Sequence, residues 1–264
     1  MSLVLTAERL ATGEHVPADE LAHRIADALH DGERWFGIWG EDPYLHIAVS
    51  ALLEYGECLS PLDAPRLDDP FAASARPATV ALRPLGPNGL AATFGLSGHA
   101  IPADPQRLLS ANLDVGRVTG SGGSSAHLVV GATVEQQGDD TPLVLSEVDR
   151  RPGREDPGSS RHSLRGASMV ISNGQFLLDT RVAPKAVPYD GALDVGIMRA
   201  GRFREGGVWR KIARGDRVGP ELFQAHLVDL IEIDGPVFLA VDAHVGIEGP
   251  LRIEVHQTPL ALWL

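Results

Sequence analysis

The chain has 264 residues, 44% of them hydrophobic, so it is long enough to bury one large core or two smaller ones. Its formal net charge of −12 excludes nucleic acid as a partner and opposes adhesion to anionic lipid, which favours small molecules. No apolar stretch approaches the roughly 20 residues of a membrane span, and we expect a cytoplasmic protein, a compartment that suits the single Cys58. The basic residues are almost all arginines, because only Lys185 and Lys211 are lysines, a bias typical of GC-rich genomes of the actinobacterial type.

The first sixty residues predict a β-α-β-α order and therefore a small parallel sheet. In the first expected helix, Leu21, Ile25 and Leu29 share one face, and Pro17 suits its start. The expected elements are strands at residues 3–6 and 34–39 and helices at residues 17–30 and 44–55.

After residue 78 short β-like runs dominate, which predicts a β-rich, antiparallel, sandwich-like region. Residues 60–78, rich in Pro, Asp and Ala, are expected to be a connection, and residues 120–125 a hairpin turn. Residues 137–166 are expected to be a surface loop or, alternatively, a lid that closes on a ligand. The expected strands are residues 79–82, 90–94, 126–134, 168–171, 193–198, 228–233, 237–241 and 251–255.

Four motifs in the second half occur in a recognisable order. They are Leu113-Asp114-Val-Gly-Arg-Val, Asn173-Gly174, Ala183-Pro-Lys-Ala-Val-Pro-Tyr-Asp190-Gly-Ala-Leu-Asp194-Val and Val241-Asp-Ala-His244. Together they resemble the second half of the diacylglycerol kinase and sphingosine kinase family, which includes the bacterial YegS-like lipid kinases. The resemblance implies a two-domain, α/β plus β fold: a reduced nucleotide-domain-like α/β domain over residues 1–100 and a β-rich, sandwich-like substrate-binding domain over residues 101–264.

The resemblance also implies roles for individual residues. Asp242 matches the aspartate that acts in the family as general base toward the lipid hydroxyl. Asp190 matches an aspartate that binds a structural magnesium, and Asn173 matches the asparagine that begins the substrate-side loop. Where the family has Gly and Glu after its general base, this chain has Ala243 and His244.

Asp242 and His244 are the predicted catalytic pair, and Asn173 and Asp190 the predicted substrate-binding residues. Residues two apart on a strand face the same side, so Asp242 and His244 could form a carboxylate–imidazole pair that moves protons near neutral pH. A solvated polar pair at a strand end fits the same spacing equally well.

The first half departs from the family where ATP phosphates would bind. Gly40-Glu-Asp-Pro-Tyr-Leu-His-Ile stands in place of the family's Gly-Gly-Asp-Gly-Thr-Leu-Asn-Glu, and Pro43 removes an N–H group where a phosphate needs one. A second glycine loop is interrupted in the same way, as Pro84-Leu-Gly-Pro-Asn-Gly. The chain also begins at what resembles the family's second strand. We therefore expect no ATP and no other cofactor, and no His-Glu-x-x-His or paired-cysteine spacing predicts a metal site.

These observations favour an ATP-independent protein that binds an amphipathic, lipid-like or polyketide-like molecule and promotes its cyclisation, rearrangement or isomerisation in secondary metabolism. A divergent lipid kinase that transfers phosphate from ATP is one alternative, and a non-catalytic lipid-binding pseudokinase is the other. A homodimer is a further expectation, because the loss of a first strand would leave a sheet edge to cover.

Overall fold

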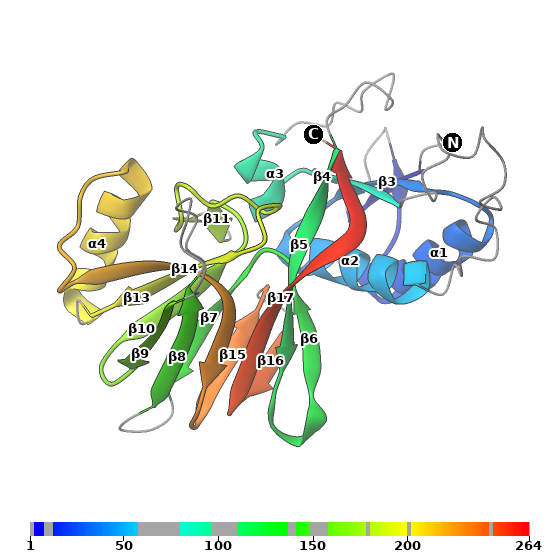
Figure 1. Cartoon of the computed structure of the whole chain (residues 1–264). Coiled ribbons are helices and arrows are strands. Elements are labelled where there is room, and N and C mark those ends of the chain that lie inside the picture. The colour runs from blue at the N-terminus through cyan, green and yellow to red at the C-terminus, as the bar shows by residue number, and fades with distance from the viewer. Residues whose placement is uncertain are drawn as a thin grey trace, which may run out of the picture.

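The computed structural model describes residues 3–7, 13–57, 80–96, 110–136, 141–147, 158–177, 180–199, 202–242 and 245–263. It is a mixed α/β structure in which 15 strands form one hydrogen-bonded network flanked by a few helices (Figure 1). The main path of this network runs β16-β15-β7-β10-β13-β14-β17-β4-β3-β1-β2, with β5–β6 and β8–β9 as side branches. Cys58 and the expected connection over residues 60–78 lie outside the described residues.

The N-terminal strands are parallel, as the β-α-β-α pattern predicts. Leu21, Ile25 and Leu29 of the first helix are buried, and Gly32 adopts a φ of 94° just after the helix ends. The elements are β1 (Leu3–Thr6), β2 (Glu14–His15), α1 (Ala18–His30), β3 (Trp35–Trp39), α2 (Asp42–Glu57), β4 (Ala81–Leu85) and α3 (Gly89–Thr93).

The remaining strands pair antiparallel, except for one short parallel contact of the last strand. They are β5 (Ser110–Thr119), β6 (Ser125–Leu128), β7 (Gly131–Gln136), β8 (Pro142–Glu147), β9 (Gly158–Ser163), β10 (Ser168–Ser172), β11 (Phe176–Leu177), β12 (Thr180–Arg181), β13 (Leu193–Met198), β14 (Phe223–Ile233), β15 (Val237–Val241), β16 (Val245–Glu248) and β17 (Leu251–Trp263). A 3₁₀ turn at Ser121–Gly123 closes the expected hairpin between β5 and β6. Helix α4 (Arg202–Arg214) packs Val208 and Ile212 against Met198 of β13.

The last strand, β17, joins the two parts of the structure. It pairs antiparallel with β5 and β14, and its residues Ala261 and Leu262 pair in parallel with Ala81 and Leu82 of β4. Figure 1 shows it as the red strand that runs from the β-rich part up to β4. One hydrophobic core lies mainly under the parallel strands and a second among the antiparallel strands. The boundary at residue 100 stays a prediction.

Three sequence-based expectations about local structure are wrong. Residues 90–94 were expected to be a strand, but residues 89–93 form α3, because the Asn88 side chain accepts the N–H of Ala91 and caps the helix. The expected strand over residues 126–134 is two strands, β6 and β7, separated by a turn at Val129 and Val130.

The third concerns residues 137–166, expected to be a loop or a lid. Much of the segment is in fact two antiparallel strands, β8 and β9, and Leu143 and Leu145 of β8 are fully buried. The alternation of Leu143, Leu145 and Glu147 is a period-two pattern that the neighbouring prolines and arginines obscure. None of the described helices is long and apolar enough to cross a membrane.

Candidate functional site

A pocket of about 590 Å³ lies between helix α2 and strands of the β-rich part. Helix α2 contributes residues 46, 50, 53 and 54, a spacing that places them on one helix face. The neighbouring face of α2, with Leu45, Val49 and Leu52, packs into the hydrophobic core. The complete lining is His46, Ser50, Leu53, Glu54, Val115, Arg117, Ser125, Ala126, His127, Val245, His256 and Thr258.

A carboxylate–imidazole pair lies at the wall of this pocket, which His46 lines and the fully buried Asp242 does not. His46 Nδ1 lies 2.8 Å from Asp242 Oδ2, and both side chains are buried. His46 comes from the first turns of α2 and Asp242 directly follows β15, so the pair joins residues 196 positions apart in the chain. An ionised carboxylate is an acceptor only, so a neutral imidazole that bonds to one through Nδ1 carries its proton there and has Nε2 as its basic nitrogen.

The carboxylate of Asp242 is held by the backbone of the turn between β6 and β7. Its Oδ2 accepts the N–H of Val129 at 2.9 Å, and its Oδ1 accepts the N–H groups of Val130 and Gly131, each at 2.8 Å. With His46, four donors therefore converge on two oxygens. This saturation suits an orienting and charge-stabilising role better than direct proton abstraction from a substrate.

The backbone of Asp242 has an unusual conformation that produces this arrangement. Its φ of 47° is the one positive value among the described non-glycine residues, and aspartate tolerates the left-handed region better than most residues. Its N–H donates to the carbonyl of Gly131 at 2.8 Å. The left-handed turn thus ends β15 and directs the carboxylate back onto the turn at residues 129–131.

Asn173 supports the same turn from another side. Its Nδ2 donates to the carbonyls of Asp114 and Val129, and its N–H donates to the carbonyl of Val130. Asn173 is buried and is not among the residues that line the pocket. The structure therefore connects the two predicted residues, Asn173 and Asp242, through the backbone they share rather than through a direct contact.

Asp190 lies further along the same buried polar network. Its Oδ1 accepts the N–H of Ala192, and the N–H of Gly191 donates to Asp114 Oδ2 at 2.6 Å. Asp190 is half-buried and does not line the pocket. His244, the predicted partner of Asp242, lies outside the described residues.

Several pocket residues have no motif that marks them in the sequence. His46 falls within the segment that resembles a phosphate loop, and it begins the polar series His46, Ser50 and Glu54 on a helix that is mostly apolar between its ends. That i, i+4, i+8 spacing is a signal the sequence does contain. Arg117 and His127, which lie on β5 and β6, have no comparable signature, because only strand pairing brings them opposite α2.

The loop that resembles a phosphate loop is filled by its own side chains. A Cβ atom on Gly40 would meet the side chain of Tyr44 at 2.7 Å, so the tyrosine lies directly against this glycine. The Tyr44 side chain is buried and its hydroxyl donates to the carbonyl of Val16 at 3.0 Å. Burial raises the pKa of the Tyr44 hydroxyl well above its usual value, which keeps it a neutral donor.

The second glycine loop is filled in the same manner. Gly86 has a φ of 81°, and a Cβ on it would lie 2.5 Å from the indole nitrogen of Trp39. The N–H of Gly89 donates to the buried carboxylate of Asp42 at 2.7 Å. Backbone N–H groups in such loops are what bind phosphate in nucleotide sites, and here one of them is engaged by a carboxylate.

Neither a protein-family model nor a curated protein sequence matches the chain. Solved structures from Bacillus anthracis str. Sterne are similar to it over almost its whole length. One is a diacylglycerol kinase with 12% identity and a TM-score of 0.62, covering 99% of this chain and 96% of its own. Two putative diacylglycerol kinases have 11% and 13% identity, TM-scores of 0.64 and 0.60, and coverage of 99% of this chain and 96% and 97% of theirs.

Proposed function

We propose that this chain, which has the fold of diacylglycerol-kinase-like proteins, converts an amphipathic, lipid-like or polyketide-like molecule by acid–base chemistry that uses no ATP. The observation that carries the proposal is the buried pair of His46 and Asp242 beside a pocket of about 590 Å³. The volume lies within the range of small-molecule sites. Cyclisation or isomerisation is the reaction class that such a pair can serve without a second substrate.

In this proposal His46 moves the proton and Asp242 orients the ring. His46 Nε2 removes a proton from a carbon next to a carbonyl group, and the imidazolium returns it at the end of the rearrangement, so that no net proton is consumed. The charge of Asp242 stabilises the imidazolium that forms between these steps. This assignment differs from the sequence-based hypothesis, in which Asp242 and His244 form the catalytic pair.

The other lining residues suit an amphipathic substrate. Leu53, Val115 and Val245 offer apolar contacts, while the guanidinium of Arg117 offers hydrogen-bond donors from strand β5. A carbonyl oxygen facing these donors would have its developing negative charge stabilised as the proton leaves. Asn173 and Asp190 then serve the shape of the site through the backbone they hold, rather than by touching substrate.

The alternative function, phosphate transfer from ATP, is favoured by the similarity to structures described as diacylglycerol kinases. It would require the loops at Gly40 and Gly86 to bind a triphosphate. Tyr44 and Trp39 occupy the space against those two glycines, so both aromatic side chains would have to move.

Magnesium-ATP titrated into the protein separates the two functions. We expect isothermal titration calorimetry to detect no binding tighter than about 100 μM, equivalent to roughly −5.5 kcal/mol. A substitution that vacates the loop, Tyr44→Ser, provides the matched control, since the family has a small hydroxyl residue there. Tight binding of magnesium-ATP to the wild-type chain would favour the kinase function and contradict the proposal.

Filling the pocket tests whether the ligand binds beside His46. Ser50→Trp adds a large side chain on the pocket-lining face of α2, whereas Asp27→Trp adds the same side chain on the exposed face of α1. With a fluorescent long-chain fatty acid as the probe, we expect Ser50→Trp to weaken binding at least about tenfold, because the added ring takes volume from the site. Equal probe affinity in both variants would place amphipathic binding elsewhere.

A further inference from the structure

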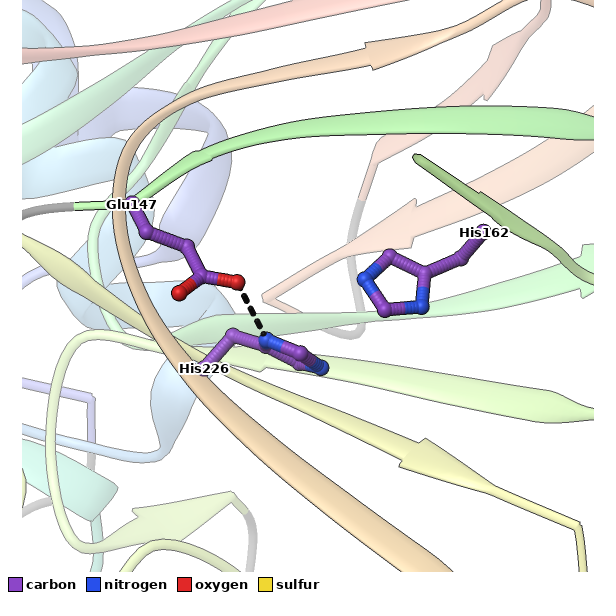
Figure 2. Close-up of side chains that lie close together, drawn as sticks. All are labelled: Glu147, His162 and His226. Carbon is purple, nitrogen blue, oxygen red and sulfur yellow. Dashed lines mark hydrogen bonds and ion pairs between the residues drawn. The ribbon is translucent and has the colours of Figure 1, made fainter. Parts of the chain in front are cut away.

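A second group of titratable side chains, Glu147, His162 and His226, shares no residue with the lining of the pocket beside His46. Glu147, His162 and His226 come from three strands, β8, β9 and β14, and one donor atom of each lies within 4.8 Å of the others. Figure 2 shows the His162 ring turned toward Glu147 and His226, whose side chains are hydrogen-bonded to each other. Two of the three lie in the segment that the sequence suggested was a loop or lid.

Strand pairing places all three side chains on one side of the sheet. Glu147 pairs with Val228, so His226, two residues before Val228, shares its side. Leu143 and Glu147 are four residues apart on β8, so their side chains face the same side of the sheet. His162 pairs with Leu143 and therefore shares that side. Leu143 and Val228 are fully buried in the core of the β-rich part, so the three polar residues lie at the end of a core-facing surface.

The three residues already contact one another through a compact polar network. His226 Nδ1 lies 2.9 Å from Glu147 Oε1, and the two imidazole rings have centroids 4.6 Å apart in an edge-on arrangement. The Ser160 hydroxyl donates to Glu147 Oε1 at 2.7 Å and lies 2.9 Å from His162 Nε2. His226 Nε2 is buried and has no hydrogen-bond partner among the described residues. A buried ring nitrogen without a partner is costly unless something binds it.

The chemistry of the donor set points to one class of ligand. Two imidazoles and one carboxylate are the protein ligands of many catalytic zinc sites, where a water molecule takes the fourth position. Magnesium and calcium prefer an all-oxygen set, which this group does not supply. Zinc ligands at 2.0–2.2 Å lie roughly 3.3 Å apart in a tetrahedron, and the three donor atoms here lie within 4.8 Å of one another.

We propose that Glu147, His162 and His226 form a binding site for a zinc-class divalent cation, with Ser160 as the outer group that positions Glu147. The site is independent of the pocket beside His46. Its ligands belong to three strands rather than to one helix or loop, so no local sequence motif predicts the site. Arg199 donates to the carbonyl of Ser163, next to His162, and its charge opposes a cation, so we expect moderate affinity.

Metal titration of the chelator-treated, tag-free chain tests this site. We expect one zinc ion per chain by isothermal titration calorimetry, with a Kd tighter than about 10 μM, and d–d absorption bands when cobalt is used as the probe. Glu147→Gln keeps the shape of the side chain but not its charge, and should weaken zinc binding by more than the about 10–100-fold that loss of an outer partner costs. His226→Ala should act in the same direction.

The matched control is His23→Ala, which removes an exposed histidine on α1. It should bind zinc like the wild type, and zinc should raise the Tm of both but not that of Glu147→Gln. Equal zinc affinity in Glu147→Gln and His23→Ala would overturn the proposal, as would wild-type binding weaker than about 100 μM. Loss of binding in His46→Gln with full binding in Glu147→Gln would also overturn it, because the ion would then occupy the pocket.

Discussion

Replacement of His46 by glutamine is expected to lower product formation by about 10²–10⁴-fold, the usual contribution of a positioned general acid–base group. Glutamine can still donate a hydrogen bond to Asp242, but it has no basic nitrogen to accept a proton. Stability should therefore change little while turnover is lost. The measurement is the metabolite profile of a strain lacking the gene and complemented with each variant, followed by mass spectrometry.

His23→Gln, on the exposed face of α1, is the matched control and should restore the wild-type profile. If His46→Gln also restores it while Ser50→Trp does not, the pocket acts by binding and folding its ligand, and acid–base catalysis is excluded. That outcome would favour a non-catalytic binder or a template for a spontaneous cyclisation.

Replacement of Asp242 by asparagine is expected to cost at least about 1–3 kcal/mol of folding free energy, the cost of leaving one buried hydrogen-bond donor without its partner. Three backbone N–H groups and His46 donate to this carboxylate. An amide has one acceptor oxygen, and its NH₂ group would face donors, so at least one buried N–H loses its partner. Urea or thermal unfolding measures the difference.

Asp229→Asn, an exposed change on β14, is the corresponding control and should be within about 0.5 kcal/mol of the wild type. Equal stability of the two variants would mean that Asp242 is not the anchor of the turn at residues 129–131. Since native domains have only about 5–15 kcal/mol of stability, the expected loss at Asp242 is a large share of the total.

The two substitutions separate the roles within one pair. His46→Gln should affect turnover far more than folding, and Asp242→Asn should affect both. The difference follows from geometry, because His46 contributes one of four hydrogen bonds at the carboxylate, whereas Asp242 contributes the acceptor for all four. A lipid kinase acting through a free aspartate base would instead be most sensitive, at the level of chemistry, to Asp242.

Local patterns predicted the elements that have a strong period. The stripe of Leu21, Ile25 and Leu29 predicted α1, and the apolar runs at residues 193–198 and 237–241 predicted β13 and β15. The pattern failed at residues 90–94, where a capping asparagine outweighed the β-like appearance of the run. It failed again at residues 137–166, where turn-forming residues flank two real strands.

The resemblance to lipid kinases, drawn from four ordered motifs, agrees with the solved structures at the level of the fold. The sites were harder to reach. The motifs point to Asp242 and Asn173, but neither side chain lines the pocket, and both hold the turn at residues 129–131. His46 received no role, because its partner lies 196 residues away and only the packing of α2 against the turn at residues 129–131 joins them.

The β-α-β-α start, the β-rich remainder and the prolines within the two glycine loops could be predicted or read from the sequence, because these features depend on residues close together in the chain. Which distant side chains meet depends on the three-dimensional fold. The fold places His46 beside Asp242, and it packs Tyr44 against Gly40 and Trp39 against Gly86. It also brings Glu147, His162 and His226 close together. The physical reason is that strand register and helix packing are long-range, and neither is encoded in the spacing of neighbouring residues.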